Sequence, residues 1–271
     1  MENNSFIFTD GTDPKMIEAY KKAQETFKYF WREQSWEYRR IIPALNLACV
    51  KAAFSQEDPE TGKDIVEHMW INDIDFDGDH VKGYLINEPN DLTNIQPGDY
   101  FEIPLNEISD WLFAITPTEK KSKLSKLFSS SSPTLPKAYG GFTIHKMRAD
   151  MEEAERQEHD DAWQLDFRDF NDVEVVHEQK EKPENLVEHP MSRNMKEDFV
   201  KFLQQYPNEL TNVDDNGLTL LHKETIAGNL SSVEVMLEAG ADRNLQSNNG
   251  KTALDYAKQL KWEHLIPALE S

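Results

Sequence analysis

Hydrophobic residues recur along the chain with two different periods, and the first of them is helical. Beyond Asp13, apolar residues follow one another at spacings of mostly three and four positions, at Met16, Tyr20, Ala23, Phe27, Phe30 and Trp31. Such a stripe is typical of a helix with one buried face. Asp13 and Pro14 make a favourable start, because Asp accepts a hydrogen bond at the N-cap and Pro fits the first helical position. The pattern predicts an amphipathic helix from residue 14 that packs on a core.

After residue 44 the period becomes strand-like. Runs rich in β-branched and aromatic residues alternate with turn sequences, the clearest of which are 58–62 and 77–79. The expected strands are 45–54, 65–71, 81–86 and 100–103, then a turn with a strand or short helix over 107–113, and finally 140–145. A helix followed by five or six strands in meander order indicates an α+β domain whose N-terminal helix lies on a mostly antiparallel sheet.

Near the C terminus the helical period returns, and here the sequence repeats itself. The turn Asn216-Gly217 recurs as Asn249-Gly250, an offset of 33 residues, and Thr219-Leu220-Leu221 recurs as Thr252-Ala253-Leu254. Two short amphipathic helices, separated at Gly228, are expected between the two turns. Neither helix can bury its apolar face alone, so neighbouring units must cover it.

This stretch resembles an ankyrin repeat, which has the same period. Thr219 and His222 stand where the family signature places its Thr and His, so the resemblance implies a turn-to-helix hydrogen bond between them, while Leu220 replaces the usual Pro. A following unit has Asp255 in place of the His, and a degraded preceding unit starts near His189. The resemblance implies an all-α domain of about three ankyrin repeats over 186–271, the outer two being degenerate caps.

Five blocks in the preceding part resemble a second family, the YegJ-like bacterial domains of unknown function. The blocks are Glu67-His68-Met69-Trp70, Gly83-Tyr84-Leu85-Ile86-Asn87-Glu88-Pro89, Gly98-Asp99, Ile108-Ser109-Asp110-Trp111 and Gly140-Gly141-Phe142-Thr143. Their order and spacing agree with that family, which brings no established activity to this chain. We therefore expect an α+β YegJ-like domain over 13–149.

Two segments depart from these domains. Residues 117–138 hold five lysines and a run of four serines, and they are expected to form a flexible insertion. Residues 150–185 form an acidic connecting segment, in which we expect an exposed helix, aromatic residues docked on one domain at 163–170, and a segment at 173–177 that can add a strand. Residues 150–188 carry 15 Asp and Glu against four Lys and Arg.

Composition limits the kinds of partner that the chain can bind and the cellular compartments in which it is expected. With 271 residues and a formal net charge of −21, the chain suggests about two domains and disfavours nucleic acid, whose phosphates it would repel. We find no signal-peptide pattern and no run of ~18–20 apolar residues, so we expect a cytoplasmic protein without a membrane span. Cys49 is the single cysteine, so an intrachain disulfide is excluded and a buried apolar role is expected.

Common catalytic motifs are absent from the sequence. It contains no Gly-rich phosphate loop after a strand, no Gly-x-Ser-x-Gly and no His-Glu-x-x-His, and we expect no metal and no cofactor. An acid–base site is arguable if the corners of the sheet bring His68, Glu88 and Asp110 together, with Trp70 and Trp111 beside them. An enzyme of unknown reaction with a pocket at these residues is therefore the alternative function.

Non-catalytic protein binding is the main interpretation. The concave face and turn tips of ankyrin repeats are the natural contact surface, so the candidate contact residues are Asp214, Asp215, Lys223, Glu224, Asn248 and Asn249. The negative charge favours a basic protein partner. A sharper hypothesis is an immunity-type protein that neutralises a basic toxin or effector. The sequence leaves the identity of the partner and the oligomeric state open.

Overall fold

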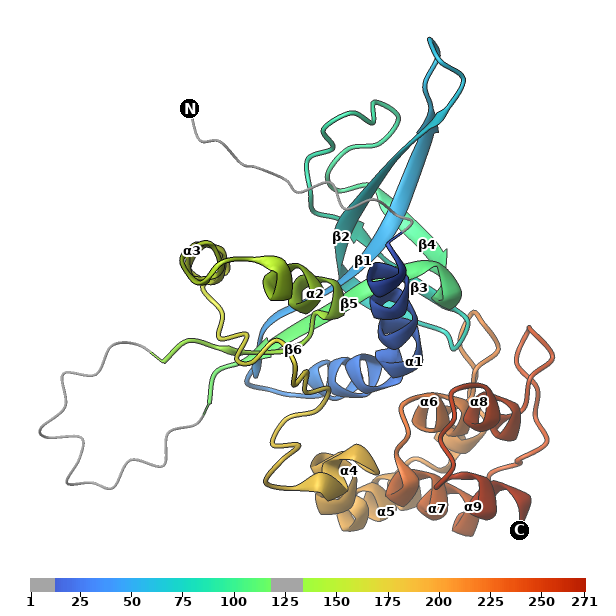
Figure 1. The fold of residues 1–271 in the computed structure, drawn as a ribbon. Helices are drawn as coiled ribbons and strands as arrows, with labels where there is room; N and C mark the ends of the chain where they lie inside the picture. Colours follow the sequence, from blue (N-terminus) through green and yellow to red (C-terminus); the bar gives the residue numbers. More distant parts are fainter. Residues whose placement is uncertain (1–12, 118–133) are drawn as a thin grey trace, which may run out of the picture.

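The computed structural model describes residues 13–117 and 134–271, which form a helix-covered sheet followed by a stack of short helices (Figure 1). This confirms the expected α+β part and the expected all-α part. Most of the expected insertion at 117–138 lies outside the described residues. Within the described ranges, no helix is long and apolar enough to cross a membrane.

The first helix, α1 (Pro14–Glu37), confirms the predicted start and stripe. The carboxylate of Asp13 accepts a hydrogen bond of 2.9 Å from the backbone N–H of Lys15, and Pro14 occupies the first turn. Ala23, Phe27 and Phe30 are buried against the sheet. A cap of this kind satisfies a backbone donor that the helix itself leaves without a partner.

The sheet has six strands, β1 (Leu45–Glu57), β2 (Asp64–Phe76), β3 (His80–Leu85), β4 (Tyr100–Pro104), β5 (Ile108–Ile115) and β6 (Lys137–Gly140). All neighbouring strands are antiparallel, in the order β4-β3-β2-β1-β5-β6. The expected meander therefore holds from β1 to β4 and fails at β5. After β4 the chain makes a short 3-10 turn (Leu105–Glu107) and crosses to the other side of β1.

Successive side chains of a strand point to opposite faces of the sheet, and along the central strands both sets are apolar. Val50, Trp111 and Phe113 belong to the core shared with α1. Cys49 and Leu112 point to the opposite face, which α2 (Phe142–Asp150), α3 (Glu153–Trp163) and the chain that follows α3 cover in part. From this second layer the side chains Ile144, Trp163, Leu165 and Phe167 pack on the sheet. The aromatic residues expected to dock near 163–170 thus include Phe167, which is 1% exposed.

Two local expectations are wrong. The segment 140–145, expected as a strand, divides into the end of β6 at Gly140 and the start of α2 at Phe142. Gly140 and Gly141 have φ values of 75° and 71°, so the chain turns there instead of extending. Residues 173–177 form no strand; the carbonyl of Glu174 accepts one hydrogen bond of 2.9 Å from the N–H of Gly140.

The C-terminal part consists of three helix pairs. The pairs are α4 (Pro190–Asn194) with α5 (Lys196–Gln205), α6 (Leu220–Ile226) with α7 (Leu230–Glu238), and α8 (Ala253–Gln259) with α9 (Ile266–Glu270). The first helices α6 and α8 pack side by side, and so do the second helices α5 and α7 (Figure 1). Each unit covers the apolar face of the next, which is the serial packing that stabilises repeat proteins.

The repeat signature makes the hydrogen bonds that the resemblance implies. Nδ1 of His222 accepts the N–H of Thr219 at 3.1 Å, and Oγ1 of Thr219 accepts the N–H of His222 at 3.3 Å. Asp255 and Thr252 make the same reciprocal pair in the next unit, at 2.8 and 3.3 Å. A carboxylate accepts such a hydrogen bond as well as an imidazole does, so the replacement of His by Asp preserves the cap.

Candidate functional site

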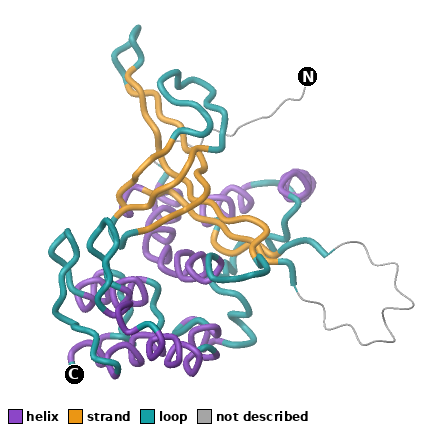
Figure 2. The backbone as a smooth tube through the Cα atoms, turned by 180° about the vertical axis from the view of Figure 1, so that it is seen from behind, coloured by secondary structure: helices purple, strands orange, loops and turns teal. Residues whose placement is uncertain are grey.

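The first helices of the stack face the α+β domain of the same chain (Figures 1 and 2). Arg39, just beyond α1, forms an ion pair of 2.5 Å with Glu224 of α6. The indole N–H of Trp36 donates to the side-chain oxygen of Asn229 at 3.1 Å, and Asn229 donates to the second oxygen of Glu224 at 2.9 Å. Glu224 is 1% exposed as a result.

The β2–β3 turn makes the second contact between the domains. Asp79 accepts hydrogen bonds from the side chains of Asn249, Lys251 and Gln259, and these bonds with the Lys251 ion pair lower the pKa of Asp79 although its burial alone would raise it. The neighbouring Gly78 packs so closely that a Cβ atom there would lie 2.4 Å from the ring of Tyr256. The turn expected from the sequence at 77–79 therefore docks on the last repeat.

These contacts form a junction between the α+β domain and the helix stack, and two of the six candidate contact residues lie in it. Glu224 is buried by Arg39, and the side-chain amide of Asn249 bonds to Asp79 at 3.0 Å. The carboxylate of Glu224 has no access to an external partner in this arrangement. Sequence reasoning placed both residues on a contact surface, and the surface they contact here belongs to the same chain.

The other four candidates lie in α6 and in the turns before α6 and α8. Lys223 pairs with Asp214 at 2.9 Å within the central repeat. Asp215 and Asn248 are exposed at neighbouring turn tips, and the side-chain amide of Asn248 donates to the carbonyl of Asp215 at 2.9 Å. These two residues, unlike Glu224, remain open to a partner.

In the α+β domain, His68 lies beside Ser109. Its Nδ1 is 2.6 Å from the Ser109 hydroxyl, and its ring stacks on Tyr20 with 5.3 Å between ring centres. Burial, with a smaller effect of the charge on Lys51, lowers the pKa of His68 to about 4. The imidazole is therefore neutral at pH 7. Sequence reasoning did not identify Ser109 or Tyr20 as neighbours of His68, because they come from β5 and α1.

Asp110 and Trp111 have structural contacts that account for their burial. The carboxylate of Asp110 accepts the backbone N–H groups of Phe142 at 3.0 Å and Thr143 at 2.7 Å, and the Thr143 hydroxyl at 2.6 Å. Trp111 donates its indole N–H to the carbonyl of Ala23 at 3.0 Å. Both side chains are 0% exposed, so neither reaches a substrate without an opening of the fold.

Trp70 and Glu88 have surroundings different from those of His68 and Asp110. Trp70 belongs to the second layer and meets Trp163 edge to face, with 6.0 Å between ring centres. Glu88 is exposed in the loop after β3. Among the residues that the structure describes, no hydrogen bond joins His68, Glu88 and Asp110. Catalysis at these residues stays a prediction.

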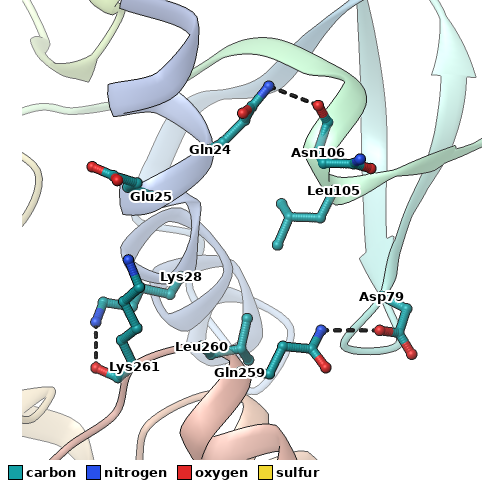
Figure 3. Close-up of a pocket in the computed structure, with 9 residues that line it drawn as sticks. All are labelled: Gln24, Glu25, Lys28, Asp79, Leu105, Asn106, Gln259, Leu260 and Lys261. Atoms are coloured by element: carbon teal, nitrogen blue, oxygen red, sulfur yellow. Dashed lines mark hydrogen bonds between the residues drawn. The ribbon is translucent and has the colours of Figure 1, made fainter. Parts of the chain in front are cut away.

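A cavity of about 360 Å³ lies where the domains meet (Figure 3). It is lined by Gln24, Glu25, Lys28, Asp79, Leu105, Asn106, Gln259, Leu260 and Lys261. The side chain of Gln24 donates to the carbonyl of Asn106 at 2.8 Å, and that of Lys28 to the carbonyl of Lys261 at 2.7 Å. Burial lowers the pKa of Lys28 to about 8. The Lys28 bond therefore joins α1 to the chain after α8. The lining residues are widely separated in sequence, which hid the cavity from sequence reasoning.

One group of side chains has the composition of a metal site. Atoms of Asp77, His80 and Glu102 lie within 4.8 Å of one another. The ammonium of Lys82 lies 2.9 Å from Asp77 and 3.8 Å from Glu102. A cation in contact with Asp77 would have to displace this ammonium, so the positive charge beside Asp77 is already supplied by the chain.

Comparison with known proteins agrees with this architecture. Residues 13–167 match the family described as "Uncharacterized protein conserved in bacteria (DUF2314)", and residues 189–265 match ankyrin repeats in three copies. A protein of Neisseria meningitidis serogroup B, named "Putative ankyrin repeat protein NMB1133/NMB1171", is 44% identical over 270 residues, which cover 100% of this chain and 98% of that protein.

Two further relatives match parts of the chain. The uncharacterized protein YegJ of Escherichia coli is 30% identical over 60 residues, which are 22% of this chain and 39% of YegJ. A Danio rerio protein named "Putative palmitoyltransferase ZDHHC13" is 47% identical over 49 residues, which are 18% of this chain and 8% of that protein. Because the first family match spans more than half of the sequence, the chain belongs to the bacterial DUF2314 family, in a form that also carries ankyrin repeats.

Proposed function

We propose that this protein is a non-catalytic protein-binding module that takes a basic partner at the tips of its ankyrin turns. The observation that carries the proposal is the direct connection of two neighbouring tips. The N–H of Asn248 donates to the carbonyl of Asn216 at 3.0 Å, and its side chain donates to the carbonyl of Asp215. Tips held in this way form one preorganised edge, which reduces the entropy lost on binding.

Charge supports a basic partner. The chain has a formal net charge of −21, and Asp215 is exposed at the connected tips. A field of this sign accelerates encounter with a basic protein and repels nucleic acid. An immunity-type protein that neutralises a basic toxin or effector has these properties, and we include that role in the proposal.

The junction changes which part of the stack we assign to the partner. Because Glu224 and Asn249 contact the α+β domain, the inner side of the stack is engaged near α1 and the β2–β3 turn. We assign binding to the outward tips at Asp215 and Asn248 instead of the inner helices.

The test is affinity capture from the native cells at low salt, with the full chain as bait. The double variant Asp215→Lys with Asn248→Lys raises the charge of the tips by three units. We expect the wild-type chain to retain a basic protein and the variant to retain at least about tenfold less of it. The matched control, Glu155→Lys with Gln157→Lys on the exposed side of α3, makes the same change of charge and is expected to retain it.

Two results would contradict the proposal. The first is recovery of no basic protein by the wild-type chain. The second is an equal loss with the control on α3, which would show attraction by net charge without a contact at the tips.

A further inference from the structure

The second layer of the α+β domain leaves part of its sheet face uncovered. This layer packs on β1, β5 and β6 and reaches β2 at Trp70. Beyond Trp70, the described part of the chain leaves large apolar side chains open on β3, β4 and the loop after β3. Tyr84, Ile86 and Tyr100 are 45%, 44% and 54% exposed. Contiguous exposed apolar groups on a sheet are a mark of an interaction surface.

Strand register shows that these side chains share one face. Asn72 pairs with Tyr84, and Tyr84 pairs with Tyr100, so the three form one row across β2, β3 and β4. The two tyrosine rings meet edge to face, with 5.4 Å between centres. Ile86 is two residues beyond Tyr84 and therefore extends the same face.

A second row on the same face is charged. Asp75 pairs with Lys82, and Lys82 pairs with Glu102. A β-bulge between Asn72 and Asp75 supplies the extra residue that keeps Asp75 on the side of Asn72. Lys82 is 12% exposed and engaged with Asp77, whereas Asp75 is exposed and the side chain of Glu102 is 48% exposed. The accessible charge of this row is therefore negative.

The edge of the sheet next to these rows is also free. β4 pairs with β3 on one side and has no second strand neighbour among the described residues. Some N–H and C=O groups of Tyr100–Pro104 therefore point outward, and a strand from another chain can pair with them. An edge of this kind selects an extended segment over a helix.

We propose that this open face, made of Asp75, Tyr84, Ile86, Tyr100 and Glu102, binds an extended basic segment of another protein, which adds to β4 as a seventh strand. Tyrosine rings attract the guanidinium and ammonium groups of Arg and Lys. Glu102 and Asp75 pair with the same groups, and β4 supplies the backbone hydrogen bonds. The site belongs to the α+β domain and does not depend on the ankyrin tips.

The experiment measures binding of a labelled peptide of alternating Arg and Val, eight residues long, to the full chain by fluorescence anisotropy. A peptide of alternating Glu and Val is the probe of opposite charge. We expect Tyr100→Ala and Glu102→Lys each to weaken binding of the Arg-Val peptide about tenfold. Glu158→Lys on α3 makes the same charge change as Glu102→Lys, away from the face, and is expected to weaken it less than about twofold.

A second peptide tests strand addition. Methylation of alternate backbone nitrogens on the edge that pairs with β4 removes the donors and is expected to abolish binding, while methylation on the opposite edge is tolerated. The proposal is overturned if Glu158→Lys weakens binding as much as Glu102→Lys, if Tyr100→Ala binds as the wild type does, or if both methylated peptides bind equally. Sedimentation that shows a wild-type dimer, dissociated by Tyr100→Ala, would assign the face to a second copy of the chain instead.

Discussion

At the scale of single residues, Gly228 shows how little room the repeat leaves. It has a φ of 72°, and a Cβ atom there would lie 2.5 Å from the indole of Trp262. We expect Gly228→Ala to lower the free energy of unfolding by roughly 3 kcal/mol or more, because backbone strain and overpacking act together. Gly240 is the matched control, since it has a φ of 93° and a Cβ atom there would meet no other atom within 4 Å.

Urea denaturation measures both glycine variants. Gly240→Ala introduces the backbone strain alone, which costs about 1–2 kcal/mol. Equal losses for the two variants would show that Trp262 yields without cost and that packing at Gly228 is unimportant.

The sequence predicted residues whose partners lie nearby in the chain. Thr219 and His222 are three positions apart, and their reciprocal bonds follow from the local signature. Glu224 is two positions further on, yet its burial depends on Arg39, far away in sequence. A Glu on a short helix is usually exposed, and nothing local to it indicates that a second domain covers it.

At the scale of elements, the helix α2 depends on a cap that a neighbouring strand supplies. Its own N-cap is Gly141, which has no side chain to bond, and Asp110 of β5 accepts from the first turn instead. We expect Asp110→Ala to cost about 3 kcal/mol, because it leaves buried N–H groups without partners. Asp110→Asn keeps one acceptor oxygen and is expected to cost less.

Hydrogen exchange at the first turn of α2, with denaturant unfolding, measures this effect. Asp58→Ala is the control, since Asp58 accepts similar bonds in an exposed turn, at 2.9 Å from the N–H of Glu60. A loss for Asp110→Ala no larger than that of Asp58→Ala would contradict the role of the cap.

The same cap explains why residues 142–145 of the strand expected at 140–145 are helical. Phe142, Thr143 and Ile144 have high β propensity, and propensity alone favours a strand. The hydrogen bonds that Asp110 accepts and the positive φ values at Gly140 and Gly141 override this propensity. By contrast, the first four strands and α1 carry their signals locally, and the structure confirms them within a few residues. The position of β5 beside β1 was not readable, because it depends on packing over the whole sheet.

At the scale of the molecule, buried histidines make stability depend on pH. Burial is the main cause that lowers the pKa of five of them, His68, His145, His189, His222 and His264, and for His68 and His145 the value falls to about 4. The unfolded chain therefore binds more protons than the folded one between about pH 6.5 and 4. Stability is expected to fall as the pH decreases through this window.

His145→Gln isolates one contribution. His145 is 4% exposed, with its Nδ1 3.3 Å from the guanidinium of Arg148, and glutamine cannot take up a proton there. Denaturation at pH 7 and pH 5 is expected to show a drop that is smaller in the variant by on the order of 2 kcal/mol. Identical drops in the two proteins would mean that His145 does not contribute to the pH dependence. The free energy of unfolding of both proteins should change little between pH 7 and pH 8.

The joining of the two domains is the property of the whole chain that sequence reasoning did not reach. Each domain has its own signature, and the acidic segment between them suggests a spacer. The contacts that join them include single polar residues on turns and helix ends, such as Arg39 and Asp79, which have no pattern of their own. Figure 2 shows the two folds side by side, and these residues reach their partners only in that arrangement.

Asp79 tests whether the junction makes one cooperative unit. Its side chain is 20% exposed and accepts from Asn249, Lys251 and Gln259. Asp79→Lys places an ammonium against Lys251, and we expect it to weaken the junction by about 2–3 kcal/mol. The radius of gyration from X-ray scattering should increase, and a single unfolding transition should divide into two. Glu238→Lys, the same charge change on the exposed end of α7, should leave both unchanged.

A charge swap separates repulsion from misfolding of the turn. Lys251→Asp in the same chain as Asp79→Lys restores opposite charges at the same two positions. If repulsion across the junction is the cause, the double variant regains part of the lost compactness and its two transitions merge again. A double variant as expanded as Asp79→Lys alone would show that Asp79 matters for the shape of the β2–β3 turn, and that the domains are held by Arg39, Glu224 and the contacts of α1.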